Sequence, residues 1–321
     1  MSIFEERRKF SQDRLDKLST QVGELEYVKR LDPLCIYVTG SFGRLEATQH
    51  SDLDLFFVHL GNEKIHRVSR LDKVLVDAEL IKLAKRESFP EFSRDGRFLE
   101  IHYLEDIQAA LGSPEDDYRN YFTARMLLLL ESRPLYGAGT YEKVLGDIVE
   151  TYFRDYKDHA SDFRPVFLVN DIQRYWKTLC LNYEHNRNRS LTGDEKVKSQ
   201  LKNIKLKFSR LMTCYSALAC LVARPTIDSA GVLSLVKTAP ALRIESLRND
   251  SEERGQLIDS LLGEYQWFLE FAAKPPDEQL AWIAKKENRT EALDRAQAFS
   301  GAFYRLIWDA SDPENLKYLV V

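Results

Sequence analysis

CIYVTGSFGRLEATQHSDLDLFFV, residues 35–58, is the stretch that decides the fold of this 321-residue chain. Its two ends, CIYVT (35–39) and DLDLFFV (52–58), have the β-branched and aromatic content of buried strands. The segment between them has the glycine and polar content of a turn-rich connection. The pattern predicts two strands that pair with each other.

Asp52 and Asp54 stand two residues apart in the second predicted strand. Because residues i and i+2 of a strand project from one face, the two carboxylates should converge while Leu53 and Leu55 enter the core. Mg2+ takes oxygen ligands and completes its shell with water and substrate phosphates. The pair therefore predicts a site for Mg2+ or Mn2+, with two ions as in two-metal phosphoryl chemistry. A hairpin with two exposed aspartates is the simpler alternative, but DLDLFFV is too apolar for a solvated edge strand.

Gly40 and Ser41 begin the predicted turn. A glycine lets backbone N–H groups approach a phosphate, and the serine hydroxyl adds one more donor. Gly43 could serve the same close approach, and Arg44 adds positive charge. We expect Gly40, Ser41 and Arg44 to contact a nucleotide.

This stretch resembles the signature of polymerase-β-like nucleotidyltransferases. The GSFGR form is similar to the PII-uridylyltransferase-like branch and to bacterial anti-phage nucleotidyltransferases, including the Hailong type. The resemblance is close over residues 35–58 and looser, in the order of elements, to about residue 135. It implies an α+β fold in which a nucleotidyltransferase sheet with flanking helices precedes an all-helical domain. It also implies transfer of NMP or dNMP from a nucleoside triphosphate, with ATP or dATP favoured, and release of pyrophosphate.

That superfamily commonly places a third metal-binding carboxylate on a following strand. FLEIHYL, residues 98–104, alternates like a strand and presents Glu100 and His102 on one face. Glu100 is the candidate third ligand, with an ordinary surface glutamate as the alternative. His102 could take a proton from the acceptor or be a polar strand residue. Asp77 and Glu79 are weaker candidates because they fall in a helical pattern.

Further predicted elements complete the first domain. Apolar spacing predicts a helix over 2–30 and another over 67–87, the latter with its apolar positions at Leu71, Val74, Leu75, Ala78 and Ile81. DYRNYFTARMLLLLE reads as a closing helix, and SRPLYGAG (132–139) has the Pro and Gly content of a boundary. We expect a catalytic domain over 1–138 and a helical domain over 139–321 that covers the nucleotide or holds the acceptor.

The second domain should be almost wholly helical, with no strand. Its periodic stretches lie near 141–157, 165–185, 197–223, 256–273 and 291–309. In the family, such a domain usually lends lysine or arginine to the triphosphate.

Residues 174–210 hold ten basic and three acidic residues, which favours a phosphate-facing surface. Arg174, Lys177 and Lys205 are the candidates, and a solvated helix face is the alternative for each. Nearby aromatic residues could stack a base, although their helical spacing favours core packing. They are Tyr175, Trp176 and Tyr183.

Composition limits the remaining classes. Lysine plus arginine (46) nearly balances aspartate plus glutamate (50), which argues against indiscriminate coating of nucleic acid. The four cysteines have no CxxC pair and read as buried free thiols in a reducing compartment. The charged N-terminus and the shortness of the longest apolar stretch, 211–223, predict a cytoplasmic protein without a membrane segment. Homo-oligomerisation is left open.

The acceptor is not determined by the motif. The chain ends in ENLKYLVV, and we expect an ordered tail that packs on its own domain or a partner, or else docks toward the active site with the Tyr318 hydroxyl as acceptor. Resemblance to the Hailong type implies a short single-stranded oligonucleotide product, primed from the tail, in anti-phage defence. The alternatives are transfer to another protein or tRNA, as in regulatory enzymes and toxins, or a catalytically reduced nucleotide-binding module.

Overall fold

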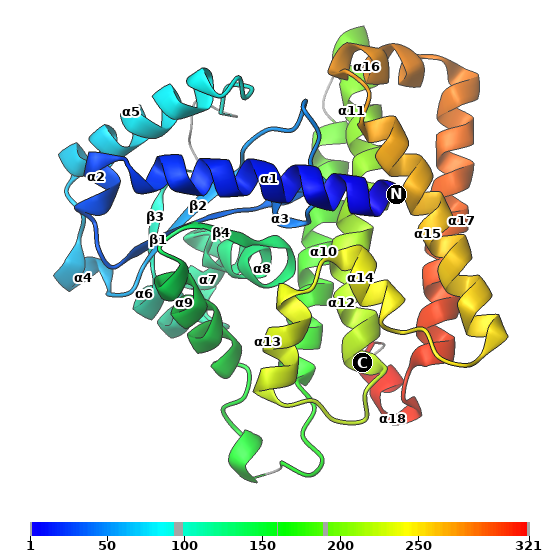
Figure 1. Cartoon of the computed structure of the whole chain (residues 1–321). Helices are drawn as coiled ribbons and strands as arrows, with labels where there is room; N and C mark the ends of the chain where they lie inside the picture. Colours follow the sequence, from blue (N-terminus) through cyan, green and yellow to red (C-terminus); the bar gives the residue numbers. More distant parts are fainter. Residues whose placement is uncertain (1, 93–98, 159, 189–191, 320–321) are drawn as a thin grey trace. The chain divides into compact units, whose positions relative to one another are not determined.

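The computed structural model describes all residues except 1, 93–98, 159, 189–191 and 320–321. The chain divides into two compact units, residues 1–154 and 155–321 (Figure 1). The first unit is a mixed α/β structure, and the second is helical.

The first unit contains a four-stranded sheet flanked by helices. Its elements, in chain order, are α1 (Ile3–Gly23), α2 (Glu26–Lys29), β1 (Leu34–Val38), α3 (Gly40–Gly43), β2 (Leu55–His59), α4 (Glu63–His66), α5 (Arg70–Arg86), β3 (Ile101–Tyr103), α6 (Leu104–Ala110), α7 (Pro114–Tyr118), α8 (Tyr121–Glu131), β4 (Arg133–Tyr136) and α9 (Ala138–Glu150).

The sheet has the strand order β3-β2-β1-β4. β1 pairs antiparallel with β2, from Leu34 opposite His59 to Val38 opposite Leu55, which confirms the predicted pairing. β4 lies antiparallel on the other side of β1, and β3 runs parallel to β2. The start of the predicted third strand lies outside the described residues.

Helices cover both faces of this sheet. One face packs against α1 and α5 in a core that includes Leu18, Ile36 and Phe57, each with no exposed surface. On the other face, the Tyr37 hydroxyl donates to the Ala124 carbonyl of α8 at 3.4 Å, and the Tyr37 ring lies 6.2 Å from that of Tyr141 on α9. The two central strands, β1 and β2, therefore have two buried faces, which explains their nearly continuous apolar sequence.

Helix α5 is predicted correctly, but its buried face is wrong. The expected apolar positions Leu71 and Val74 are 76% and 54% exposed, and Leu75 and Ile81 are exposed as well. The face that packs on the sheet is formed by Val76, Leu80, Leu83 and Ala84. Two apolar stripes share this helix, and periodicity alone did not distinguish between them.

The segment predicted as a domain boundary is instead a strand. Residues 133–136 form β4, and Arg133 in this strand lies opposite Val38 of β1. The first unit continues through α9 to Arg154, because α9 packs against β1 and β4. The division between the units thus falls after residue 154, whereas the sequence suggested 138.

All regular secondary structure in the described residues of the second unit is helical. Its longer elements are α10 (Val166–Arg187), α11 (Gly193–Lys205), α12 (Leu211–Val222), α13 (Ser229–Lys237), α15 (Glu252–Ala272), α16 (Pro276–Ala284) and α17 (Lys286–Ala310). Its short elements are a 3-10 turn (Tyr156–Asp158), α14 (Pro240–Glu245), α18 (Pro313–Leu316) and a final 3-10 turn, η4 (Lys317–Leu319).

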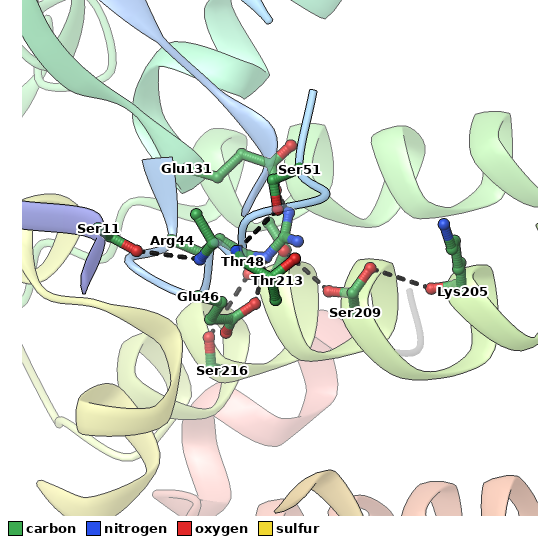
Figure 2. A network of polar contacts seen from close by, with 11 residues as sticks. Ser11, Arg44, Glu46, Thr48, Ser51, Glu131, Lys205, Ser209, Thr213 and Ser216 are labelled. Atoms are coloured by element: carbon green, nitrogen blue, oxygen red, sulfur yellow. Dashed lines mark hydrogen bonds and ion pairs between the residues drawn. The ribbon is translucent and has the colours of Figure 1, made fainter. Parts of the chain in front are cut away.

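A π-helical segment, η3 (Leu206–Arg210), joins α11 to α12. Phe208 within it is fully buried and stacks on Phe268 and Phe299, with ring centroids 5.0 and 5.1 Å away. The Ser209 hydroxyl donates to the Lys205 carbonyl at 3.1 Å, and the Thr213 hydroxyl donates to the Ser209 carbonyl at 2.9 Å (Figure 2). The buried Phe208 ring and the two hydroxyl hydrogen bonds lie at this π-helical segment, which the periodicity of the sequence does not reveal.

Candidate active site

The turn after β1 requires a glycine at position 40. Gly40 opens α3 with a φ of +66°, in the left-handed region that side chains disfavour. A Cβ added there would lie 2.8 Å from Oδ2 of Asp54. The Thr39 N–H also donates to the Asp54 carbonyl at 3.0 Å. The Asp54 carboxylate therefore occupies the space that a side chain at position 40 would need.

Asp52 and Asp54 stand just before β2 rather than inside it, because the ladder with β1 ends at Leu55. The predicted alternation is nevertheless confirmed. Leu53 and Leu55 are 6% and 2% exposed and belong to the core under α1 and α5, whereas Asp52 is exposed and Asp54 is half-buried. The two carboxylates are thus turned away from that core.

Glu100 stands just before the neighbouring strand, β3, which begins at Ile101. Phe57 is opposite Ile101 in the parallel pair, and Leu99 and Ile101 pack toward the α1 and α5 core. Glu100, between them, must project the other way and is exposed. Glu100 is thus turned away from the α1 and α5 core, as Asp52 and Asp54 are, and its role as a third metal ligand stays a prediction.

The pair of aspartates suits a hard divalent cation. Mg2+ usually binds through one or two carboxylates and keeps several positions for water and substrate phosphates, and an exposed Asp52 beside a half-buried Asp54 offers such a donor set. Among the described residues, no three His, Cys, Asp or Glu side chains lie close enough together to hold a metal ion. The predicted set of Asp52, Asp54 and Glu100 is therefore not assembled as a cluster in this structure.

His102 is a buried aromatic-layer residue. Its ring lies 6.3 Å from that of Phe56 in a stacked arrangement and 5.8 Å, edge-on, from that of Tyr121. Burial lowers the pKa of His102 to about 4, so its imidazole is neutral at neutral pH. Two roles were predicted for His102. The buried environment fits a structural role in the strand and does not fit proton transfer with an acceptor.

Arg44 is held by two carboxylates. Its side chain is buried, with Nε donating to Glu46 at 2.7 Å and Nη1 donating to Glu131 at 2.6 Å (Figure 2). A Cβ at Gly43 would collide with the Glu131 carbonyl, so this glycine allows α3 to approach the end of α8. Both residues anchor the turn, whereas the sequence suggested that they face a phosphate.

The segment between α3 and Asp52 is fixed by serine and threonine hydroxyls. Ser11 on α1 accepts the Ala47 N–H at 2.9 Å, and Ser51 accepts the Thr48 N–H at 2.9 Å (Figure 2). The Thr48 hydroxyl accepts the His50 N–H at 3.1 Å. Sequence reasoning missed Ser11, whose only signal is a small polar residue on the buried face of α1.

The predicted basic residues lie on α10 and α11 of the second unit. Arg174 is partly exposed, with Nη1 3.7 Å from Asp171, and Lys177 and Lys205 are exposed. Because α10 packs against α11 and η3, these residues belong to one helical layer. The neighbouring Trp176 packs edge-on against Tyr215 at 5.7 Å, as predicted for core aromatics.

The tail packs on its own unit, which was one of the two predicted arrangements. The Asp312 N–H donates to the Val222 carbonyl at 2.9 Å, and the Gln173 amide donates to the Leu319 carbonyl at 2.9 Å. Tyr318 lies on η4, half-buried, beside Arg164 and at the edge of a narrow cavity. The last two valines lie outside the described residues.

The cysteines are free, and Cys35, Cys214 and Cys220 are buried as predicted, whereas Cys180 is half-buried. Burial raises the pKa of the Cys35 thiol to about 12, so the thiol is protonated and unreactive at neutral pH.

Comparison of the chain with protein-family models and with curated proteins found no match. No described helix combines the length and apolar character that a bilayer crossing requires. The arguments for a function therefore come from the residues and their geometry.

Proposed function

We propose that this protein is a metal-dependent nucleotidyltransferase that transfers NMP or dNMP from a nucleoside triphosphate and releases pyrophosphate. One observation carries the proposal. At the start of α3 the Asp54 carboxylate occupies the space that a side chain at Gly40 would need, and the exposed Asp52 stands two residues before Asp54. In this proposal the turn binds the phosphates and the neighbouring aspartates bind the metal, which are the roles that the GSFGR and SDLDL motifs imply by resemblance.

The turn supplies hydrogen-bond donors to the triphosphate. The absence of a side chain at Gly40 lets a phosphate approach the backbone N–H groups, and the half-buried Ser41 hydroxyl adds a donor. Arg44 has an indirect, structural role, because its ion pairs with Glu46 and Glu131 hold the end of α3 in place. Loss of Arg44 should therefore weaken the fold as well as activity.

Asp52 and Asp54 would hold Mg2+ or Mn2+. When bound, two such ions would offset the phosphate charge and polarise the attacked α-phosphorus. The protein keeps Asp54 fixed against Gly40 and leaves Asp52 exposed to complete the site with the nucleotide. Glu100 is also turned away from the α1 and α5 core and is the third carboxylate to test. The lysines and arginine on the helical unit that would meet the triphosphate are Arg174, Lys177 and Lys205.

For the acceptor, we favour template-independent synthesis of a short oligonucleotide, or self-modification, in anti-phage defence, with Tyr318 as the primer. Tyr318 is half-buried near the end of the described chain, on a 3-10 turn that packs against α10. A tyrosine hydroxyl is a competent nucleophile once a base takes its proton. Transfer to a separate protein or to tRNA is the second candidate, and it requires the same Asp52 and Asp54 chemistry.

Incubation of the full chain with each labelled NTP and dNTP, with Mg2+ or Mn2+, tests these candidates together. Separation of free, oligomeric and protein-linked label identifies the acceptor class. Intact mass then decides the tail version, since Tyr318→Phe should abolish any added mass. Added mass that survives Tyr318→Phe would contradict that version, whereas oligomers free of protein would support a separate primer.

The rival class is a module that binds nucleotide without turning it over. Asp52→Asn distinguishes the two, with the exposed Asp13→Asn on α1 as the matched control. An enzyme loses nucleotide consumption in Asp52→Asn and keeps it in Asp13→Asn. A binding module shows no consumption in any of the three proteins.

A further inference from the structure

A cavity of about 450 Å3 lies between the middle of α1 and the end of α5. Arg14 and Lys17 of α1 line one side, Arg86 lines another, and Thr48 and Gln49 come from the segment that leads to Asp52. All of these residues belong to the first unit. The volume of the cavity is within the range of small-molecule sites, about 300–1,000 Å3, and is larger than a single inorganic phosphate requires.

The cavity carries an excess of positive charge. Arg14, Lys17 and Arg86 face one carboxylate, Glu87, which accepts from Lys17 at 2.6 Å and from Gln21 at 2.7 Å. These hydrogen bonds lower the pKa of Glu87, so it is charged at neutral pH and offsets only one of the three cations. Arg86 is exposed and makes no hydrogen bond or ion pair to the described part of the chain. An anionic ligand would find its strongest open donor there.

Aromatic side chains stand beside these cations. Phe10 is 36% exposed at the cavity wall. Phe89 is placed in the cavity by the turn that ends α5, where its N–H donates to the Ala84 carbonyl at 3.0 Å, and the Arg14 guanidinium covers its ring at 4.8 Å. The exposed Phe10 ring is suited to stack a flat base while the cations hold a phosphate.

We propose that this cavity is a second nucleotide site, one that binds the phosphate through Arg86 and Lys17 and the base against Phe10. It is separate from the candidate active site, because its lining includes neither the Gly40 and Ser41 turn nor Asp52 and Asp54. The ligand class is a mononucleotide, and inorganic phosphate is the simpler source of the same anionic chemistry.

A ligand bound in the cavity should affect the position of Asp52 through the segment that joins Thr48 to Asp52. Gln49 is three residues from Asp52, a span of at most about 11 Å. The Thr48 hydroxyl accepts the His50 N–H at 3.1 Å, and the Ser51 hydroxyl accepts the Thr48 N–H at 2.9 Å. A ligand that contacts Thr48 and Gln49 therefore steadies the segment that positions Asp52. This regulatory consequence rests on the proposed function, whereas binding itself does not.

Calorimetric titration of the full chain with AMP in EDTA tests the site without metal. The titration is repeated on Asp52→Asn, on Arg86→Gln, and on Lys85→Gln, a matched loss of an exposed cation on α5 outside the cavity. We expect AMP to bind wild type, Asp52→Asn and Lys85→Gln alike, and Arg86→Gln about tenfold more weakly. Amide hydrogen exchange at His50 should slow when AMP binds.

Absence of metal-free AMP binding, or binding that Arg86→Gln leaves unchanged, would overturn the site. Equal affinity for inorganic phosphate would overturn the nucleotide assignment in favour of the free anion. Metal-free binding without any nucleotidyl transfer would uphold the cavity while the proposed function fails, so the two failures are distinguishable.

Discussion

Gly40 is the residue at which the turn after β1 meets the Asp54 carboxylate. Its left-handed φ and the 2.8 Å gap from a hypothetical Cβ to Oδ2 of Asp54 both exclude a side chain. Gly40→Ala should cost about 1–2 kcal/mol of stability from the backbone alone and displace Asp54, so turnover should fall more than stability predicts. Chemical denaturation and nucleotide consumption measure the two effects.

Gly146 provides the matched control for that substitution. It lies inside α9, where an added Cβ would meet no atom within 4 Å. Gly146→Ala should stabilise the protein by about 0.5–1 kcal/mol, because alanine loses less backbone entropy in a helix. Equal effects of the two substitutions would contradict the close contact assigned to Gly40.

His102 gives the fold an acid-sensitive position. Its pKa is lowered to about 4 by burial, below the ordinary value of 6.5, so the unfolded chain binds more protons between these values. Stability should fall as the pH drops from 6.5 toward 4, by about 3 kcal/mol at most from this residue. His102→Phe should flatten that dependence, measured as urea midpoints across the range. An unchanged slope would show that His102 is not the source.

Sequence pattern predicts single residues well where a strand's alternation determines them. Asp52 and Asp54 face away from the core because Leu53 and Leu55 must enter it. Arg44 could not be assigned in the same way, because its partner Glu131 is distant in sequence and comes near only through packing of α8. Motif position alone therefore suggested a phosphate contact for Arg44, where the fold provides an ion pair.

Helix α5 shows how an element can be predicted while its orientation is not. It carries two apolar stripes, and only the one with Val76 and Leu80 is buried. Leu80→Ala should cost about 2–5 kcal/mol through cavity formation, whereas Leu71→Ala should change stability by less than about 0.5 kcal/mol. Thermal or chemical denaturation measures both stability losses. A larger loss in Leu71→Ala than in Leu80→Ala would show that the other face of α5 is the buried one.

Two further elements depend on tertiary contacts that local pattern does not contain. β4 is a short strand with a proline, typical in sequence of a linker, and it becomes a strand because β1 offers an unpaired edge. The π-helical turn at 206–210 accompanies the burial of Phe208 among Phe268 and Phe299. Neither feature changes hydrophobic periodicity enough to be detected along the sequence.

At the scale of the whole molecule, the change in periodicity along the sequence predicts that an α/β unit precedes a helical unit. The predicted basic residues lie on α10 and α11 of the helical unit. The boundary is later than predicted because α9 completes the first unit. The acceptor depends on surfaces and partners that motif spacing does not encode, which is why Tyr318 enters only as a proposal.

Pyrophosphate release tests the central claim most directly. The full chain is incubated with each nucleoside triphosphate and Mg2+ or Mn2+, beside Asp52→Asn and Asp13→Asn. The account predicts metal-dependent pyrophosphate release by wild type and Asp13→Asn, and a loss of at least about 100-fold in Asp52→Asn. Release that Asp52→Asn retains, or no release with any nucleotide, would contradict nucleotidyl transfer at this site.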